Sequence, residues 1–272
     1  MTMYWIYDLP IWLFGIITVV FFVAIAVGGL VLAHGYIKNN FGASDAMNGA
    51  VGGYIGGMAG LYGLLLGLII VASMQNFGNA STLTTREAAA TGALYVDISS
   101  YPEPHRSAMR ETLKTYVNFV VNEEWRAQQR GQLIHGGRKI LLDLQQILLA
   151  LEPGDSRQRT IQAEAFQAFN KLIDARRMRL DTVDDGLPAV LWIVVISGSI
   201  LSIAVSYFLH FSHFRSHLLL TAVMAAFIAL LVFLAAAVDN PFRGGLSVSP
   251  GAYRSLLETW ASDQISAPVP MP

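Results

Sequence analysis

Four long stretches of the chain contain no charged residue. They are residues 11–33, 50–74, 187–209 and 218–238, and they hold 23, 25, 23 and 21 residues. Because a helix rises about 1.5 Å per residue, each stretch is long enough to cross a hydrocarbon core of about 30 Å. The pattern therefore predicts an all-α membrane protein with four transmembrane helices.

The segment between the second and third crossings has a different pattern. In residues 80–186 apolar side chains recur at helical spacing in three or four runs, and turn-forming sequences at 101–104, 136–137 and 152–154 separate these runs. The first run either begins a new helix at Thr85 or continues the second crossing. We predict a soluble helical-bundle insert at 80–186, between transmembrane hairpins at 1–79 and 187–240, with a C-terminal tail at 241–272.

The distribution of charge supports this division. Residues 75–186 hold 14 of the 18 Lys and Arg residues and 14 of the 19 Asp and Glu residues. A charge at the centre of a bilayer costs several kcal/mol, so charges are confined to the parts outside it. The net charge of -1 gives no indication of nucleic-acid binding, and the absence of cysteine excludes disulfides and thiol chemistry. A cysteine-free chain fits a bacterial inner-membrane protein.

Basic residues near the crossings predict the orientation. Four crossings place both termini and the insert on the same side of the membrane. That side has six arginines near the membrane: Arg86, Arg176, Arg177, Arg179, Arg243 and Arg254. The other side has two basic residues, Lys38 and Arg215. Because positive charge favours the cytoplasmic side, we predict cytoplasmic termini and a cytoplasmic insert.

The second crossing is rich in glycine, with many pairs four residues apart. These glycines are Gly49, Gly52, Gly53, Gly56, Gly57, Gly60, Gly63 and Gly67. On a helix this spacing forms two smooth grooves that other backbones can approach closely. Either neighbouring subunits fill the grooves or the chain's own helices do. The remaining face carries Tyr54, Met58, Leu61 and Leu65, which we predict to line an apolar pore constriction.

The four crossings contain no ionisable side chain at depth. Intramembrane enzymes and proton-coupled carriers need such groups, so the sequence predicts that the protein is not an enzyme. The insert also has no Gly-rich phosphate loop of a nucleotide-driven transporter.

Four histidines gather on one side of the predicted membrane. They are His34 at the end of the first crossing and His210, His213 and His217 between the third and fourth. Spacings of three and four would place the last three on one helical face. The cluster is either a metal, haem or pH-sensing site or a set of interfacial histidines that bind nothing.

Three aspartates precede the third crossing and a fourth follows the last one. Asp181, Asp184, Asp185 and Asp239 offer the oxygen ligands that Ca²⁺ prefers, so a calcium site is one hypothesis. The alternative is that the three grouped aspartates and their neighbours Arg176, Arg177 and Arg179 neutralise one another.

Several short motifs resemble those of a known family. In order they are Glu87-Ala with Leu94-Tyr95, Pro102 with Arg106, Tyr116 with Glu124-Trp125, Leu187-Pro188 with Trp192, the run from Asp239 to Gly244, and Val248-Ser-Pro250. Their order resembles the bacterial bestrophin-like domain family over residues of about 10 to 258. The bestrophins that give the family its name are pentameric anion channels gated by Ca²⁺, and their second crossing lines an apolar neck. This chain departs from that pattern in its single acid, Asp239, after the last crossing and in its glycine-rich second crossing.

Our hypothesis from the sequence is a homo-oligomeric ion channel in the bacterial inner membrane. Residues 50–74 are nearest its pore axis, its partners are lipid and inorganic ions, and the family resemblance implies anion conduction and a pentamer. The rival is a membrane-anchored interaction or regulatory protein that uses the insert and conducts nothing.

Overall fold

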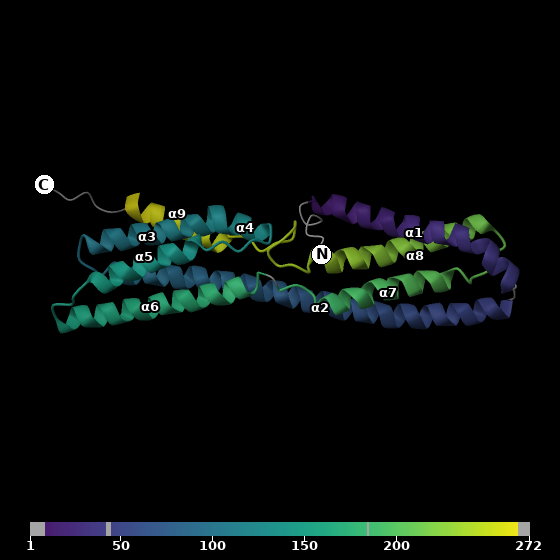
Figure 1. Ribbon diagram of the computed structural model, residues 1–272, viewed down its shortest axis with the longest axis horizontal. Helices are drawn as coiled ribbons and strands as arrows, with labels where there is room; N and C mark the ends of the chain where they lie inside the picture. The colour runs from purple at the N-terminus through teal and green to yellow at the C-terminus, as the bar shows by residue number, and fades with distance from the viewer. Residues whose placement is uncertain (1–8, 42–44, 184, 266–272) are drawn as a thin grey trace. The chain divides into compact units, whose positions relative to one another are not determined.

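The computed structural model describes residues 9–41, 45–183 and 185–265, and within these ranges its regular structure is helical (Figure 1). The elements are α1 (Ile11–Asn40), α2 (Asp45–Ile98), α3 (His105–Phe119), the π-helical turn η2 (Val120–Glu124), α4 (Trp125–Gln129), α5 (Gly136–Ala150), α6 (Ser156–Asp181), α7 (Ala189–Ser206), α8 (Phe214–Ala237) and α9 (Gly251–Ile265).

The contacts divide the chain into two compact units. The span unit comprises the described residues up to Asn76, Gly186–Asn240 and Gly244–Leu246. The bundle unit comprises Phe77–Asp185, Pro241–Arg243 and the described residues from Ser247 onward. Helix α2 contributes residues to both units.

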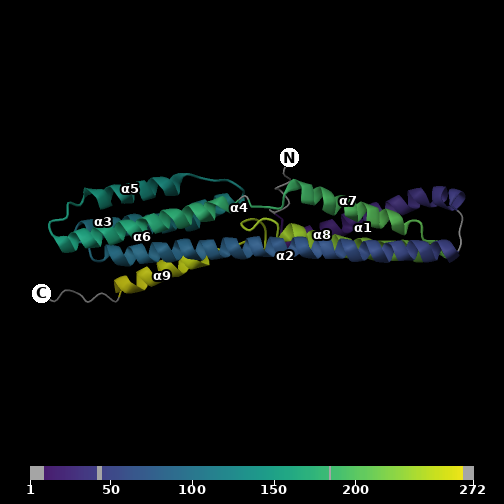
Figure 2. The same cartoon turned by 90° about the horizontal axis from the view of Figure 1, so that it is seen from below.

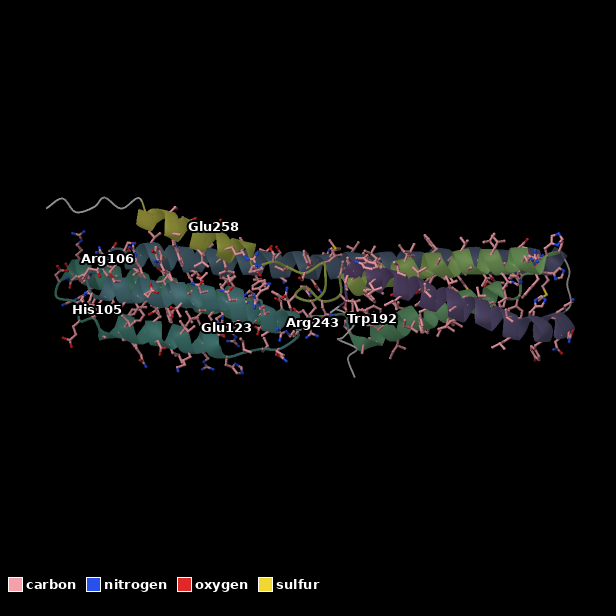
Figure 3. The ribbon with its side chains drawn as sticks, turned by 90° about the horizontal axis from the view of Figure 1, so that it is seen from above. His105, Arg106, Glu123, Trp192, Arg243 and Glu258 are labelled. Carbon is pink, nitrogen blue, oxygen red and sulfur yellow. The ribbon has the colours of Figure 1, made fainter. Side chains whose placement is uncertain are left out.

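Helices α1, α2, α7 and α8 are each long and apolar enough to cross a membrane. The prediction of an all-helical chain with four candidate spans is therefore confirmed. In Figure 3 the side chains along much of α1 and α8 are mostly carbon, as lipid-facing helices require.

Helix α2 continues well beyond the predicted crossing, as a single helix that ends at Ile98 (Figure 2). Residues 75–98 are more polar than the crossing but contain no proline, so the backbone hydrogen bonds continue. The helix ends before Pro102, as the sequence predicted. Of the two alternatives for the first insert run, continuation of the second crossing is correct.

Two tyrosines bind the span helices together. The Tyr62 hydroxyl of α2 donates to the Val195 carbonyl oxygen at 2.8 Å and lies 2.6 Å from the Ser199 hydroxyl, both on α7. The Tyr207 hydroxyl, after α7, donates to the Ala26 carbonyl oxygen of α1 at 2.8 Å. The apolar core between these contacts includes Leu66, Ile69, Val195, Ile203, Ala225, Ile228 and Val232.

The bundle unit packs α2, α3, α5, α6 and α9 around a second apolar core. Asp155 caps helix α6, because its Oδ1 atom accepts from the Gln158 backbone N–H at 2.7 Å. Helix α9 lies in the segment that the sequence suggested was a tail. Its Trp260 stacks on Tyr95 of α2 with ring centroids 4.2 Å apart, so this segment belongs to the core.

Candidate functional site

The glycines of the second crossing form an open face on α2. All eight, from Gly49 to Gly67, are exposed. A Cβ atom placed on any one of them would meet no atom of the described residues within 4 Å, apart from its sequence neighbours and the turns of its own helix. We call these eight residues the glycine face. The chain's own helices do not fill the two grooves that the sequence predicted.

Other glycines of the span unit behave differently. A Cβ atom on Gly198 of α7 would lie 2.6 Å from the Tyr62 ring, and one on Gly29 of α1 would lie 2.5 Å from the Tyr207 hydroxyl. These two positions admit the tyrosines that join the helices. Close packing within the chain therefore uses glycines of α1 and α7, and the glycine face takes no part in it.

The residues predicted to line a pore lie in two environments. Tyr54 and Leu61 are 71% and 74% exposed, and Met58 is half-buried. Leu65 is also half-buried, and it packs against the apolar core of the span unit. The exposed apolar surface of α2 continues from Leu61 to Leu64, Leu68 and Val71.

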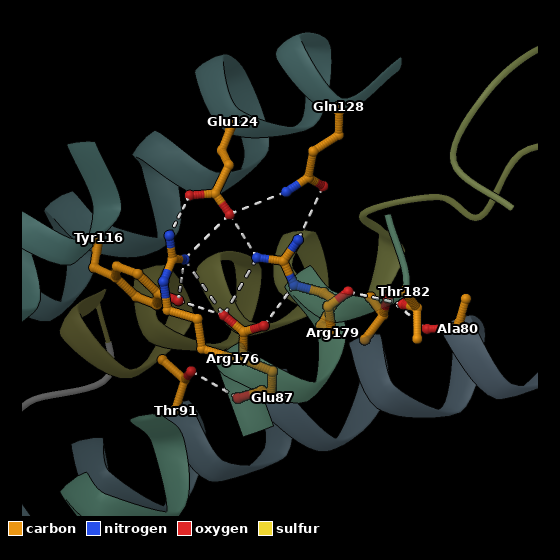
Figure 4. Close-up of polar contacts among 10 residues, drawn as sticks. Ala80, Glu87, Thr91, Tyr116, Glu124, Gln128, Arg176, Arg179 and Thr182 are labelled. Carbon is orange, nitrogen blue, oxygen red and sulfur yellow. Dashed lines mark hydrogen bonds and ion pairs between the residues drawn. The ribbon is translucent and has the colours of Figure 1, made fainter. Parts of the chain in front are cut away.

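The bundle unit contains a buried cluster of four charged side chains, shown in Figure 4. Glu87 comes from α2, Glu124 from the end of η2, and Arg176 and Arg179 from α6. All four are buried. We call these residues the charge cluster; its formal charges, two negative and two positive, cancel.

Each guanidinium group of the charge cluster contacts both carboxylates. Arg179 donates from Nε to Glu87 Oε2 at 2.5 Å and from Nη2 to Glu124 Oε1 at 2.6 Å. Arg176 donates from Nη2 to Glu124 Oε2 at 2.6 Å and lies within 3.8 Å of Glu87 Oε1. Charge-assisted hydrogen bonds of this kind are the strongest in proteins, and the planar guanidinium fixes their directions.

Neutral side chains complete the charge cluster. Gln128 accepts from Arg179 Nη1 at 2.9 Å and donates to Glu124 Oε1 at 3.3 Å, and the Tyr116 hydroxyl accepts from Arg176 Nη1 at 2.9 Å and donates to Glu87. Burial alone would raise the pKa of Glu124, but the charges of Arg179 and Arg176 outweigh it and lower that pKa. Burial, together with the charge of Glu87, raises the pKa of Tyr116 well above its ordinary value. Both groups are therefore in their usual charge states at neutral pH.

The first turn of α5 lies directly against the charge cluster. A Cβ atom on Gly137 would be 2.7 Å from Arg176 Nη2 and 2.9 Å from Glu124 Oε2. The sequence suggested that Gly136 and Gly137 only mark a helix boundary. The structure shows that Gly137 also lets the α5 backbone approach an ion pair.

The charge cluster corrects the sequence interpretation of two arginines. Arg176 and Arg179 pair with Glu87 and Glu124, and neither forms an ion pair with Asp181 or Asp185, the described aspartates that follow. Glu87, Tyr116 and Glu124 were recognised only as family motifs. Their arginine partners were missed, because α6 is distant from them in the sequence. A signal was available in the spacing of Arg176 and Arg179, which places both on one face of α6.

Other family motifs also contact one another. The Trp125 Nε1 atom donates to the Val248 carbonyl oxygen at 3.1 Å within the bundle unit. In the span unit, Asp239 accepts from the Leu187 backbone N–H at 2.5 Å and from Trp192 Nε1 at 3.3 Å. Asp239 thus fixes the chain that enters α7 (Trp192 is labelled in Figure 3).

The predicted calcium ligands do not gather into a metal site where they are described. Asp181 and Asp185 are exposed, Asp239 is buried with the contacts given above, and Asp184 lies outside the described residues. Among the described residues, no group of three or more His, Asp or Glu side chains could hold a metal ion. Because one predicted ligand is not described, the four-aspartate calcium site stays a prediction.

The histidines at the other end of the span helices make separate contacts. The His34 ring lies 4.4 Å from the Phe214 ring, and the buried His217 places Nε2 3.0 Å from the Ser206 carbonyl oxygen. His210 exchanges two hydrogen bonds with Asn48 through its backbone N–H and carbonyl groups. The His213 carbonyl oxygen accepts from the Ser216 and His217 backbone N–H groups at 3.0 Å and 3.3 Å. A ligand-binding or pH-sensing role for the four histidines stays a prediction.

These features define a class: an all-helical membrane protein with four candidate spans, an open glycine face on α2 and a bundle unit with a charged core. The Bestrophin-like domain family matches residues 20–253, so the chain belongs to that family. The resemblance seen in the sequence motifs is thereby confirmed.

The fold is similar to that of a protein whose crystal structure is described as a membrane protein. The TM-score is 0.60, the match covers 90% of this chain and 97% of that one, and the two sequences are 13% identical. At this identity the likeness concerns the fold alone. No curated protein matches the chain.

Proposed function

We propose that the protein is a homo-oligomeric ion channel in which α2 lies near the pore axis. The glycine face is the observation that supports this proposal best. A helix with eight exposed glycines is costly, because glycine lowers helix stability by about 1 kcal/mol relative to alanine in a helix interior. Close approach of another backbone offsets that cost, and no helix of the same chain provides it. A second copy of α2 does.

An apolar constriction fits the exposed side chains of α2. Tyr54, Leu61, Leu64 and Leu68 are all at least 60% exposed. In a ring of subunits such residues would form a hydrophobic constriction that gates by dewetting. Half-buried Met58 could join them, whereas Leu65 also serves the core of its own subunit.

Anion conduction is the finer part of the proposal and has two supports. The first is membership of the Bestrophin-like domain family, because the bestrophins that give it its name are anion channels. The second is Arg86, which is exposed on α2 and lies eighteen residues, about five helical turns, after Leu68. Rings of arginine favour anions. The proposal also includes a pentamer, a bacterial inner-membrane location, and cytoplasmic termini and bundle unit.

The first experiment measures the oligomeric state. We would measure the mass of the purified protein in lipid nanodiscs, for the wild type and for Gly57→Val. The matched control is Gly28→Val on α1, because Gly28 is also exposed and its Cβ would also meet nothing within 4 Å. We expect a ring-sized oligomer for the wild type and the control, and smaller species for Gly57→Val. A monomeric wild type would overturn the proposal.

The second experiment measures ion conduction. Planar-bilayer recording in a chloride gradient should show a reversal potential near that of chloride, and Arg86→Glu should shift it towards the cation value. Silence under all tested ions and voltages would instead favour the rival, a membrane-anchored interaction protein. That rival has its own support in Leu142 and Leu149, which are 47% and 62% exposed on α5.

A further inference from the structure

The charge cluster has features that stability alone does not require. Removing two carboxylates and two guanidinium groups from water costs several kcal/mol per ion, and their mutual attraction only about balances this cost. Apolar residues of similar volume usually stabilise such a position as well or better. The cluster must therefore be understood by what ion pairs supply and apolar contacts do not, which is fixed direction.

The geometry of the charge cluster fixes α2 against several neighbours at once. Arg179 bridges two carboxylates from different elements, Glu87 on α2 and Glu124 on η2, and Gln128 on α4 holds its remaining nitrogen. A sliding or rotating α2 would break the Glu87 contacts, and residues 80–94 of α2 contain no other carboxylate to replace it. Leu, Val and Phe contacts tolerate such movements much better, because dispersion has no preferred direction.

The helix that carries Glu124 departs from α-helical geometry at that residue. Helix α3 continues into the π-helical turn η2, whose last residue is Glu124, and then into α4. Such turns are rare and occur often at functional sites. On the opposite side, the α5 backbone at Gly137 leaves no room for a side chain beside the Arg176–Glu124 pair. The surrounding backbone is thus adapted to the charge cluster.

We propose that the charge cluster is a positional lock. The first part of the proposal is that it holds the α2 segment of the bundle unit in one position and rotation against α3, α4 and α6. The second part is that breaking the charge cluster changes the open probability of the pore. The second part rests on the proposed channel function, because it assumes that α2 lines a pore. The first part does not.

The test of the first part is a distance measurement within the bundle unit. The chain has no cysteine, so spin labels can be attached at introduced cysteines without background. We choose Ala93 on α2 and Lys171 on α6, which are both exposed. Labelled chains are diluted into unlabelled ones in nanodiscs, so that electron–electron resonance reports only the distance within one chain.

Two variants separate a lock from simple stabilisation. Glu87→Gln leaves an unbalanced buried charge, whereas Glu87→Met/Arg179→Met removes one charge of each sign. We expect Glu87→Gln to lower the melting temperature and the double variant to reverse most of that decrease. The distance distribution of the double variant should nevertheless be broader than that of the wild type or have two maxima. A single narrow maximum at the wild-type distance in the double variant would overturn the lock.

Gly137→Ala provides a second test if the double variant does not fold. It keeps all four charges and displaces the Arg176–Glu124 pair, so we expect a broadened distance distribution with a small change in melting temperature. The control is Glu103→Gln, which removes an exposed ion pair with Arg106 and should leave the distribution unchanged. A wild-type distribution in Gly137→Ala would contradict the proposal.

The second part is tested by single-channel recording of Glu87→Met/Arg179→Met. We expect a change of several-fold in open probability with unchanged single-channel conductance, because the charge cluster is outside the proposed pore lining. An unchanged open probability would overturn this part. A silent wild type would overturn the channel function and with it this part, but the distance measurement would still decide whether the lock exists.

Discussion

Helix α2 meets opposite conditions in the two units. In the span unit its glycine face meets none of the other described helices, while in the bundle unit Glu87 is completely buried and contacts α3 and α6. In the span unit the chain's own helices cover only the side of α2 that carries Tyr62, Leu66 and Ile69. This difference indicates that the bundle unit determines the position of its part of α2, whereas the glycine face is the surface that we propose a second copy covers.

The comparison also shows how glycine spacing should be interpreted. Gly198 and Gly29 admit tyrosine side chains of the same chain, and neither belongs to the glycine face. The glycine face of α2, where the sequence signal is strongest, packs against none of the other described helices. A small-residue motif thus predicts close packing without saying which helix packs there.

The largest expected effect is on the bundle unit. Glu124→Gln leaves two buried guanidinium groups with one carboxylate, and removing one partner of a buried pair costs about 3–5 kcal/mol. We expect the free energy of unfolding of this unit to fall by about that amount in chemical denaturation. Glu103→Gln is the control, because its ion pair with Arg106 is exposed and should contribute nothing measurable. Equal effects of the two variants would mean that the charge cluster is not a special feature of the bundle unit.

A smaller effect is expected in the span unit from Gly198→Ala. Its Cβ atom would lie 2.6 Å from the Tyr62 ring, so the tyrosine must move and its hydrogen bonds to α7 weaken. Overpacking of this kind costs about 1–3 kcal/mol. Thermal unfolding in nanodiscs should show a lower melting temperature with an unchanged oligomer mass. Gly56→Ala should do the reverse, with assembly weakened and the intrachain fold unaffected; if both variants lower the melting temperature alike, the contrast between the two kinds of glycine is wrong.

The smallest expected effect concerns acid. Since the pKa of Glu124 is lower in the folded protein than its ordinary value of 4.5, the folded state binds fewer protons than the unfolded state. The stability that Glu124 contributes is therefore present above pH 4.5 and is lost as the pH falls through its lowered value. We expect the difference in melting temperature between wild type and Glu124→Gln to become smaller as the pH falls below 4.5. A difference that stays constant down to about pH 3 would show that the carboxylate is not held ionised by the arginines.

Much of the fold could be predicted from local patterns. Uncharged runs of more than 20 residues specify spans, because no soluble environment selects for them. Asp155 specifies the start of α6 and Pro102 the end of the helix before it, because capping and the missing proline N–H act within a few residues. Helix α9 was missed because a single amphipathic helix after Pro250 offers only a short pattern, and its Trp260 finds a partner in the distant Tyr95.

The sequence by itself determined which segments avoid water and where most of the helices lie, since both depend on neighbours along the chain. Only the tertiary structure decided which charges pair and which glycines stay open. Arg179 pairs with Glu87 across 92 residues of sequence and with Glu124 across 55. No local pattern selects one carboxylate among fourteen in residues 75–186. Coulomb attraction and desolvation depend on distance and burial, and the packing of the helices sets both.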